Sequence, residues 1–263
     1  MAAIVTGASS GIGAAFARLL ARQGYDVVVV ARRVERLKSL AAELEDRHGI
    51  AVTPIRLDLA SPDAAAELER ELEHSGEPVD VLVNNAGYEV DGPFLSSDWP
   101  THEAHARVLA LLPTELIHRF LPGMLERGSG RVVNVASVGG LLPCVPNEGL
   151  YAPAKHFIVA LTRALAIEYA GRGVSFTVSC PGGTSTELLD RGNAARLASS
   201  MPRFTIQSAE DVAAQTWAAA VAGRAVVVPG WPNKVTTALV HHLPQRVAQR
   251  AMARAFRADL GDA

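Results

Sequence analysis

The sequence predicts a single α/β domain built on a doubly wound parallel sheet of about seven strands. Two observations lead to this prediction. Short valine-rich runs recur along the chain without the apolar–polar alternation of a half-exposed strand, and this is typical of strands buried on both faces. Helix-like segments separate these runs, and a regular alternation of strand and helix indicates parallel strands covered by helices on both sides.

The individual elements follow from the same patterns. We expect strands at residues 2–6, 26–31, 51–57, 79–84, 131–137, 174–180 and 225–229. Helix-like segments cover residues 11–23, 33–47, 61–74, 102–127, 152–171 and 208–222, whereas residues 183–207 have no regular pattern. No linker or internal repeat divides the chain. Residues 1–230 should therefore form one domain, and residues 231–263 should add a helical extension on that domain or at a subunit interface.

Composition narrows the class of protein. Of 263 residues, 49% are hydrophobic, which is enough for a sizeable core, and the net charge of −2 does not favour nucleic acid as a partner. Cys144 and Cys180 form no paired motif, so we expect neither a disulfide framework nor a metal site. The N-terminus enters a strand at once, and no apolar run has the ~18 residues that span a bilayer. We therefore expect a soluble, cytoplasmic protein.

A glycine-rich loop follows the first expected strand. The sequence VTGASSGIG places Gly7, Gly11 and Gly13 between that strand and the next helix. Glycines there permit a tight turn and a close approach of the backbone to a ligand, and the helix N-terminus attracts a pyrophosphate. A purely structural turn is the alternative. The position within a strand–helix–strand unit favours a dinucleotide site.

The end of the second strand indicates which dinucleotide binds. Sites selective for NAD place an acidic side chain here for the ribose 2′-hydroxyl. This chain has Ala31, Arg32 and Arg33 instead, and a guanidinium suits the 2′-phosphate of NADP. The alternative is that both arginines are solvated residues of the next helix. We predict NADP(H) as the cofactor.

Tyr151 and Lys155 are the leading catalytic candidates. They lie four residues apart in YAPAK, so a helix would present both side chains on one face. The chain has only three lysines and four tyrosines, and this scarcity argues against a surface coincidence. Pro153 lies between them and is tolerated in the first turn of a helix.

Further motifs follow in a fixed order. NNAG (84–87) comes after the fourth strand, NVAS (134–137) ends the fifth, YAPAK (151–155) follows, and CPGGTSTE (180–187) comes after the sixth strand. Together with TGASSGIG, these motifs resemble those of the short-chain dehydrogenase/reductase family, over residues 2 to about 230. The resemblance implies a Rossmann-type fold, a nicotinamide cofactor and hydride transfer to or from a carbonyl or alcohol carbon.

The resemblance also implies residue roles. Ser137 would hydrogen-bond the substrate carbonyl, Tyr151 would act as general acid or base, and Lys155 would bind the nicotinamide ribose and lower the pKa of Tyr151. Lowering a tyrosine pKa from ~10 to ~7 takes roughly 4 kcal/mol of preferential stabilisation of the phenolate. The implied cofactor contacts are Gly7, Ser9, Ser10, Gly11, Ile12, Gly13, Arg32, Arg33, Asp58, Leu59, Asn85, Ala86, Gly87, Tyr151, Lys155, Pro181, Gly182, Thr184 and Thr186.

Two positions leave alternatives open. Asp58 also fits the N-terminal cap of a helix. The family often has an asparagine on the long helix before the fifth strand, where its backbone positions a water between the lysine and solvent; this chain has Leu109 there. Either another group completes the proton path or proton resupply is slower. The alternative to an enzyme is therefore an NADP(H)-binding regulator or scaffold with little turnover.

The substrate side is expected to be mainly apolar. The loop after Ser137 and residues 187–201 should wall a pocket that suits an apolar ketone or secondary alcohol. Glu89, Asp91 and Glu148 could add polar selection, but solvation at the surface is the simpler role for each. Cys144 lacks an activating base, which argues against a nucleophilic role. The expected pocket residues are Leu141, Leu142, Cys144, Val145, Leu188, Leu189 and Met201.

The C-terminal tail carries a basic stripe. Residues 234–257 include five basic residues and no acid, and Phe256 is the only aromatic residue of the stripe region. A helix of this kind could contact another subunit or an anionic membrane surface, or simply present a solvated face. We favour subunit contact over the membrane, and the family resemblance implies a homodimer or homotetramer. The stripe consists of Arg246, Arg250, Arg254 and Arg257.

Overall fold

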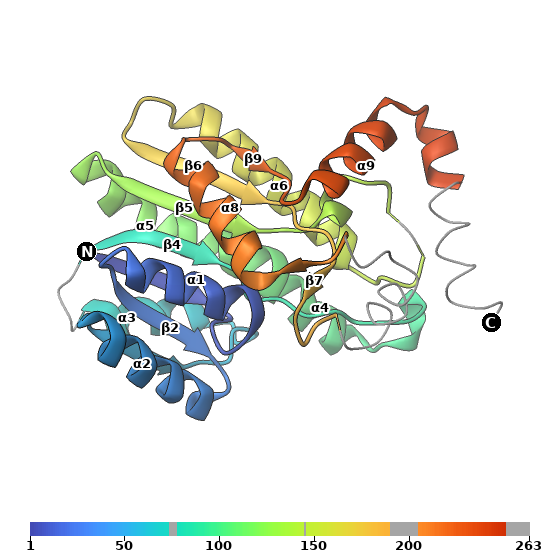
Figure 1. The fold of residues 1–263 in the computed structure, drawn as a ribbon. Helices are drawn as coiled ribbons and strands as arrows, with labels where there is room; N and C mark the ends of the chain where they lie inside the picture. The colour runs from blue at the N-terminus through green and yellow to red at the C-terminus, as the bar shows by residue number, and fades with distance from the viewer. Residues whose placement is uncertain (74–77, 145, 190–204, 251–263) are drawn as a thin grey trace.

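A seven-stranded sheet forms the centre of the molecule in the computed structural model, which describes residues 1–73, 78–144, 146–189 and 205–250 (Figure 1). All neighbouring strands pair in parallel, in the order β3-β2-β1-β4-β5-β6-β9. The predicted doubly wound fold is confirmed. The strands are β1 (Ala2–Thr6), β2 (Asp26–Ala31), β3 (Val52–Arg56), β4 (Val79–Asn84), β5 (Gly130–Val135), β6 (Val174–Ser179) and β9 (Val226–Val227).

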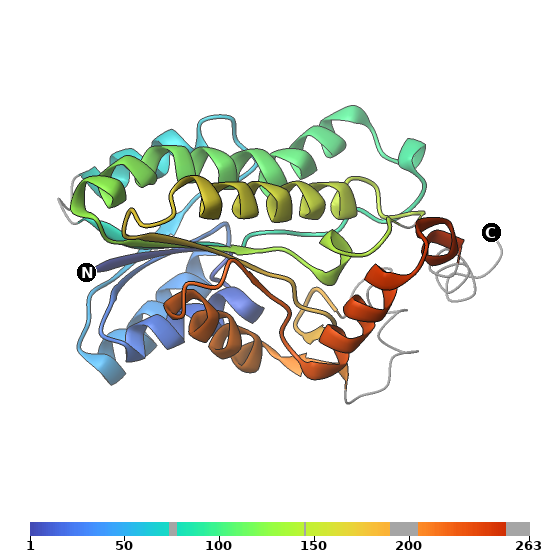
Figure 2. The ribbon, with the colours of Figure 1, turned by 90° about the horizontal axis from the view of Figure 1, so that it is seen from above.

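Helices cover both faces of this sheet (Figure 2). One face carries α1 (Gly11–Arg22), α2 (Val34–His48) and α8 (Ala209–Val221). The other carries α3 (Ala64–Glu73), α5 (Leu112–Arg127) and α6 (Tyr151–Glu168). In β1, Val5 packs into the first layer and Ile4 into the second, both fully buried. Burial on both faces explains why the strands lack an apolar–polar alternation.

Shorter elements gather at the carboxyl edge of the sheet (Figure 1). They are η1 (Phe94–Ser96), α4 (Trp99–Ala106), the π-helical η2 (Arg107–Leu111), η3 (Val138–Gly140), β7 (Thr184–Ser185), β8 (Gln207–Ser208) and α9 (Trp231–His242). The stretch 183–207, for which we expected no regular structure, thus contributes the parallel pair β7–β8. Five residues named in the sequence analysis lie outside the described part of the chain: Val145, Met201, Arg254, Phe256 and Arg257.

The run Trp99–Arg127, formed by α4, η2 and α5, is long and apolar enough to cross a membrane by length and composition. We expected no apolar run of this length. Leu109, Leu116 and Met124 of this run are nevertheless buried. Leu116 and Met124 belong to the core layer between the run and the sheet. Burial of this kind is typical of a core helix of a globular domain.

The strand order places a crevice at the carboxyl edge. β1 lies between β2 and β4, so the chain order reverses at this strand, and parallel α/β sheets bind ligands at such a switch point. The glycine loop follows β1, the NNAG motif follows β4, and Ser137 follows β5. The fold therefore brings three separate motifs to one edge.

Candidate active site

The glycine loop has a geometry that other residues could not adopt. Gly7 and Gly11 have φ angles of +68° and +55°, in the left-handed region that favours glycine. A Cβ on Gly13 would lie 2.4 Å from the Gly7 carbonyl oxygen. Ser10 caps α1 without a side-chain hydrogen bond, so the amides of the first turn face the loop opening without a local side-chain acceptor. This cradle fits the pyrophosphate of a dinucleotide.

The NNAG motif holds this loop in place. The Asn85 side-chain amide donates to the Thr6 carbonyl oxygen at 3.0 Å and to that of Gly7 at 3.4 Å. The Thr6 hydroxyl oxygen in turn accepts from the backbone N–H groups of Asn85 and Ala86, at 3.0 and 3.1 Å. Thr6, which sequence reasoning did not single out, thus positions β4 against the glycine loop. Asn85 is a positioning residue for the loop as well as a candidate neighbour of the ribose.

A buried polar chain fixes α6 on the sheet. The Asn84 side-chain amide of β4 donates to Asn134 of β5 at 2.9 Å, and the Asn134 amide donates to the Thr162 hydroxyl of α6 at 2.8 Å. All three side chains are buried, so losing one partner would leave a buried polar group unpaired. Thr162 carries no sequence signal of its own. Its role depends on the packing of α6 over β5.

Ser137, Tyr151 and Lys155 converge beside β5. Ser137 follows β5 and its hydroxyl oxygen accepts from the Gly139 N–H at 3.1 Å, while its side chain also hydrogen-bonds the Tyr151 hydroxyl. Tyr151 opens α6. Lys155, one turn later and only 5% exposed, donates to the Val135 carbonyl oxygen at 2.9 Å, and its Nζ lies 5.5 Å from the centre of the Tyr151 ring.

A close backbone approach sets the spacing of this group. A Cβ on Gly140 of η3 would lie 2.7 Å from the Lys155 carbonyl oxygen, so glycine lets the turn after Ser137 rest directly on α6. Pro153 occupies the first turn of α6, as expected.

The pKa of Tyr151 lies above its ordinary value. Burial raises it, the carboxyl group of Glu89 adds to the effect, and the hydrogen bond with Ser137 opposes it. Burial lowers the pKa of Lys155 to about 8. The expectation that Lys155 lowers the pKa of Tyr151 is not met in this structure. The lysine ammonium donates to the Val135 carbonyl oxygen rather than to the phenol, and burial of the phenol is the largest influence on the pKa of Tyr151.

Glu89 and Glu148 lie at the mouth of the site. Burial raises the pKa of each to about 7; Asp91 adds to the effect on Glu89, and Glu89 adds to the effect on Glu148. The loop after β4 meets the loop before α6, where the Gly92 N–H donates to the Asn147 carbonyl oxygen at 3.2 Å. The prediction that these two glutamates are solvated surface residues is therefore wrong. They are half-buried and act electrostatically on Tyr151.

The two candidate arginines have different surroundings. Arg33 lies on the glycine loop: its Nε and Nη2 donate to the Ser9 hydroxyl at 3.1 and 2.9 Å, and Nη2 also donates to the Ser10 hydroxyl at 2.7 Å. Arg32 is exposed and lies near Tyr88, whose pKa burial raises and the Arg32 charge partly lowers. The structure thus places Arg33, rather than Arg32, on the loop.

The residues expected around the adenine and in the loop make other contacts within the protein. The Asp58 carboxylate accepts from the Ala60 N–H at 3.1 Å and closes a local turn ahead of α3, which begins only at Ala64, so Asp58 does not cap that helix. Leu59 is buried in the core layer of α3 and α5, and Ile12 packs against the opposite layer.

Leu109 lies in the π-helical turn η2, where the Leu112 N–H donates to the Arg107 carbonyl oxygen five residues earlier. A Cβ on Gly87 would lie 3.0 Å from Leu109 Cδ2 and 3.7 Å from Lys155 Nζ. Leu109 and Lys155 therefore both lie against Gly87, and Leu109 occupies the position where the family resemblance led us to expect an asparagine. π-Turns inside α-helices are frequent at functional sites.

The segment after β6 crosses the glycine loop. The Val138 N–H donates to the Pro181 carbonyl oxygen at 2.9 Å, and the Thr184 hydroxyl donates to that of Gly182 at 3.1 Å. A Cβ on Gly11 would lie 2.9 Å from Thr186 Cγ2, so Thr186 covers the loop directly. These four residues of the CPGGTSTE motif therefore lie beside the crevice.

The expected pocket residues differ in exposure. Leu142 is buried, Leu189 is half-buried, and Leu188 and Cys144 are exposed. Burial of its thiol raises the pKa of Cys144, which keeps the thiol protonated at neutral pH and argues against a nucleophilic role.

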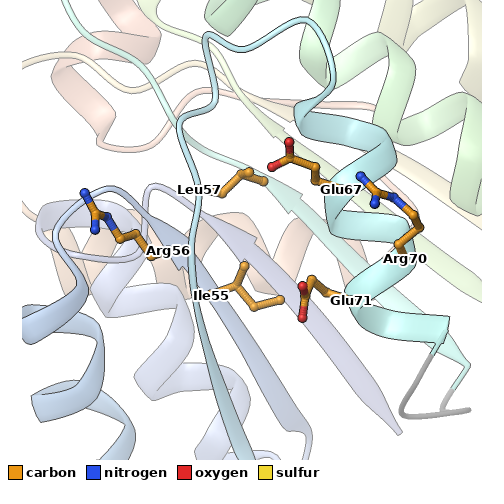
Figure 3. A pocket seen from close by; sticks show the side chains of 6 residues that line it. All are labelled: Ile55, Arg56, Leu57, Glu67, Arg70 and Glu71. Carbon is orange, nitrogen blue, oxygen red and sulfur yellow. The ribbon is translucent and has the colours of Figure 1, made fainter.

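A cavity of about 270 Å³ lies elsewhere, between β3 and α3 at the outer edge of the sheet (Figure 3). Three strands separate β3 from β5, so this cavity is remote from Ser137 and Tyr151. None of the candidate site residues lines it; its side chains are those of Ile55, Arg56, Leu57, Glu67, Arg70 and Glu71.

Comparison with known proteins agrees with this geometry. The short chain dehydrogenase family profile matches residues 1–196, about three quarters of the chain. The chain belongs to the short-chain dehydrogenase/reductase family. A short chain dehydrogenase of Pseudocercospora fijiensis is 38% identical over 206 residues, which cover 76% of this chain but only 65% of that relative, less than two thirds of its length.

Solved structures of this family extend the likeness to most of the chain. A short-chain dehydrogenase from Sphingobium yanoikuyae in complex with NADPH has a TM-score of 0.78 and 28% identity, covering 93% of this chain and 96% of the other. A short-chain dehydrogenase/reductase from Burkholderia phymatum in complex with NAD has a TM-score of 0.80 and 26% identity, covering 91% and 92%. The family is one of oxidoreductases that bind nicotinamide cofactors, and its members with similar structures include complexes of both cofactors.

Proposed function

We propose that the protein is an NADPH-dependent carbonyl reductase, or alcohol dehydrogenase in the reverse direction, acting on an apolar ketone or secondary alcohol. The observation that carries this proposal is the convergence of Ser137, Tyr151 and Lys155 at the carboxyl edge of β5. The glycine cradle opens at the same edge of the sheet. Leu142, Leu188 and Leu189 supply the apolar side of the pocket.

The preference for NADP(H) rests on Arg33. Its guanidinium lies on the Ser9 and Ser10 hydroxyls, beside the first turn of α1, where a ribose 2′-phosphate would meet a fixed positive charge. No acidic side chain ends β2, where sites selective for NAD place the acceptor of the 2′-hydroxyl. The bound nicotinamide would supply or accept the hydride.

Proton transfer to and from the substrate oxygen would be carried out by Ser137, Tyr151 and Lys155. Ser137 donates a hydrogen bond to the substrate oxygen and orients it towards Tyr151. In reduction the Tyr151 hydroxyl gives its proton to that oxygen, and in oxidation the phenolate takes it back. Lys155, with a pKa of about 8, remains mostly an ammonium at pH 7 and would bind the nicotinamide ribose. A backbone carbonyl of η2, the turn that contains Leu109, would hold a water for proton resupply.

Two further parts of the proposal concern organisation. Residues 1–230 form the cofactor-binding and catalytic domain, and residues 231–263 form an extension on it. The protein works as a homodimer or homotetramer, since the family typically forms oligomers, and it has no nucleic-acid partner. Asn233 at the start of α9 is buried against Gly182, so the extension begins in contact with the segment that covers the cofactor site.

Steady-state oxidation of NADPH with a panel of apolar ketones tests the proposal. We expect consumption of NADPH that depends on the ketone, and formation of NADPH from NADP⁺ with the matching secondary alcohol. Tight NADPH binding without turnover on any ketone would instead favour a regulator or scaffold. Absence of NADPH binding would remove both alternatives.

A further inference from the structure

Glu187 bridges two arginines at the cofactor site. Its carboxylate accepts from Arg33 Nη1 at 2.6 Å through one oxygen and from Arg36 Nη1 through the other. The hydrogen bonds from the two arginines, together with their charges, lower the pKa of Glu187 to about 2, so it stays ionised throughout the neutral range. Among the described residues, Glu187 is the only anion paired with Arg33.

This carboxylate comes from a segment remote in sequence. Glu187 follows β7, which is anchored by its pairing with β8 and by the hydrogen bond from the Gln207 N–H to the Gly183 carbonyl oxygen at 3.0 Å. The preceding Thr186 rests on Gly11 of the glycine loop. The segment therefore crosses the loop and ends with a negative charge on the arginines at the start of α2.

The guanidinium of Arg33 thus has two different kinds of partner. One edge donates to the hydroxyls of Ser9 and Ser10, and the other end donates to Glu187. A hollow of about 200 Å³ opens beside these groups, lined in part by Ser9, Arg18 and Arg36. A phosphate dianion that binds Arg33 here would have to displace the Glu187 carboxylate. Otherwise both anions would lie next to each other on the same guanidinium group.

We propose that Glu187 is a cofactor-selecting residue, an internal anion that competes with the 2′-phosphate of NADP(H) for Arg33 and Arg36. This inference rests on the proposed binding of NADP(H). NAD(H) carries a neutral hydroxyl at the same position and leaves the Glu187 ion pairs in place. The Glu187 carboxylate therefore weakens the binding of NADP(H) but not that of NAD(H). It reduces the preference for NADP(H) that the two arginines create.

The size of the effect follows from charge and exposure. The side chains of Glu187, Arg33 and Arg36 are 38%, 41% and 50% exposed, so solvent screens their interactions. A phosphate monoester carries about −1.5 to −2 charges near neutral pH, and a carboxylate about 5 Å away repels it even at a water-like dielectric. We expect removal of this charge to tighten binding of a 2′-phosphate by about tenfold.

Titration calorimetry on the full chain with Glu187→Gln tests the proposal. The probes are NADPH and adenosine 2′,5′-bisphosphate, which carry the phosphate, and NADH and 5′-AMP, which lack it. We expect Kd for the first pair to fall by about tenfold and Kd for the second pair to change by less than twofold. Glu187→Asp keeps the charge and should stay within about threefold of the wild type, which separates charge from side-chain shape.

Glu115→Gln is the matched control. Glu115 is similarly exposed (36%) and also accepts from an arginine, Arg119, but on the opposite face of the sheet. It should change no Kd. If the wild type binds NADPH and Glu187→Gln binds it no more tightly than the wild type does, this inference is overturned while the proposed function stands. A wild type that binds neither dinucleotide would remove the proposed function and this inference with it.

Discussion

Replacing Glu89 by glutamine should change the pH dependence of stability in a specific direction. Burial raises the pKa of Glu89 from 4.5 to about 7, and Glu148 behaves alike. A carboxyl group with a raised pKa holds a proton in the folded state that the unfolded chain releases. The contribution of the Glu89 carboxyl group to the free energy of unfolding is fully present below pH 4.5 and is lost as pH rises through about 7. The wild type therefore loses stability over this window.

The magnitude can be worked from the same displacement. A rise from 4.5 to about 7 corresponds to roughly 3 kcal/mol for an isolated carboxyl. Glu89 is only half-buried and shares its titration with Glu148, so we reduce the figure to about 1–2 kcal/mol. Glu89→Gln removes the charge but keeps the shape. It should therefore exceed the wild type in stability by about 1–2 kcal/mol at pH 8 and match it near pH 4.5.

Thermal unfolding monitored by circular dichroism, at intervals from pH 4.5 to 8, measures this difference. A change of 1–2 kcal/mol corresponds to roughly 2–8 °C in Tm for a domain of this size. Glu126→Gln, at the exposed end of α5, controls for the exchange of carboxylate for amide. A Tm difference that is absent at pH 8, or equally large at pH 4.5, would refute the reasoning.

Two further predictions concern the cofactor and the tail. Arg32→Ala should weaken NADPH binding by roughly 1.5–3 kcal/mol if it reads the 2′-phosphate, but the contacts of Arg33 with Ser9 and Ser10 lead us to expect the larger loss for Arg33→Ala. Fluorescence titration measures both, and equal losses for NADPH and NADH would contradict the assignment. Deleting residues 240–263 should lower the oligomer order, because it removes the basic stripe that we expect to contact another subunit. An unchanged mass in light scattering would exclude this role, and liposome co-sedimentation that is lost at high salt would favour a membrane contact instead.

The strands and the catalytic group could be predicted because their signals are local. Valine-rich runs mark strands buried on both faces, and the spacing of Tyr151 and Lys155 places them on one helix face. All seven expected strands begin and end within two residues of the observed ones, and β9 is the shortest because only Val226 and Val227 pair with β6. The π-turn at Leu109 has no comparable signal, since it depends on how α4 and α5 pack over Gly87.

The electrostatic surroundings of the site could not be predicted, because they depend on contacts between remote loops. Glu89 and Glu148 look like surface residues in the sequence, and the pairing of Gly92 with Asn147 brings them to Tyr151. Glu187 meets Arg33 across 154 positions of chain. Neither periodicity nor motif spacing records such a contact.

The Tyr151→Phe variant tests the central claim most directly, because it removes only the hydroxyl that is proposed to carry the proton. Turnover of the best ketone and the Kd of NADPH should be measured on the same preparation. We predict that turnover falls below a tenth of the wild-type rate while the NADPH Kd stays within about twofold, since the ring preserves the packing at the start of α6. A variant that keeps a tenth or more of the wild-type rate would contradict the assignment of Tyr151 as the general acid.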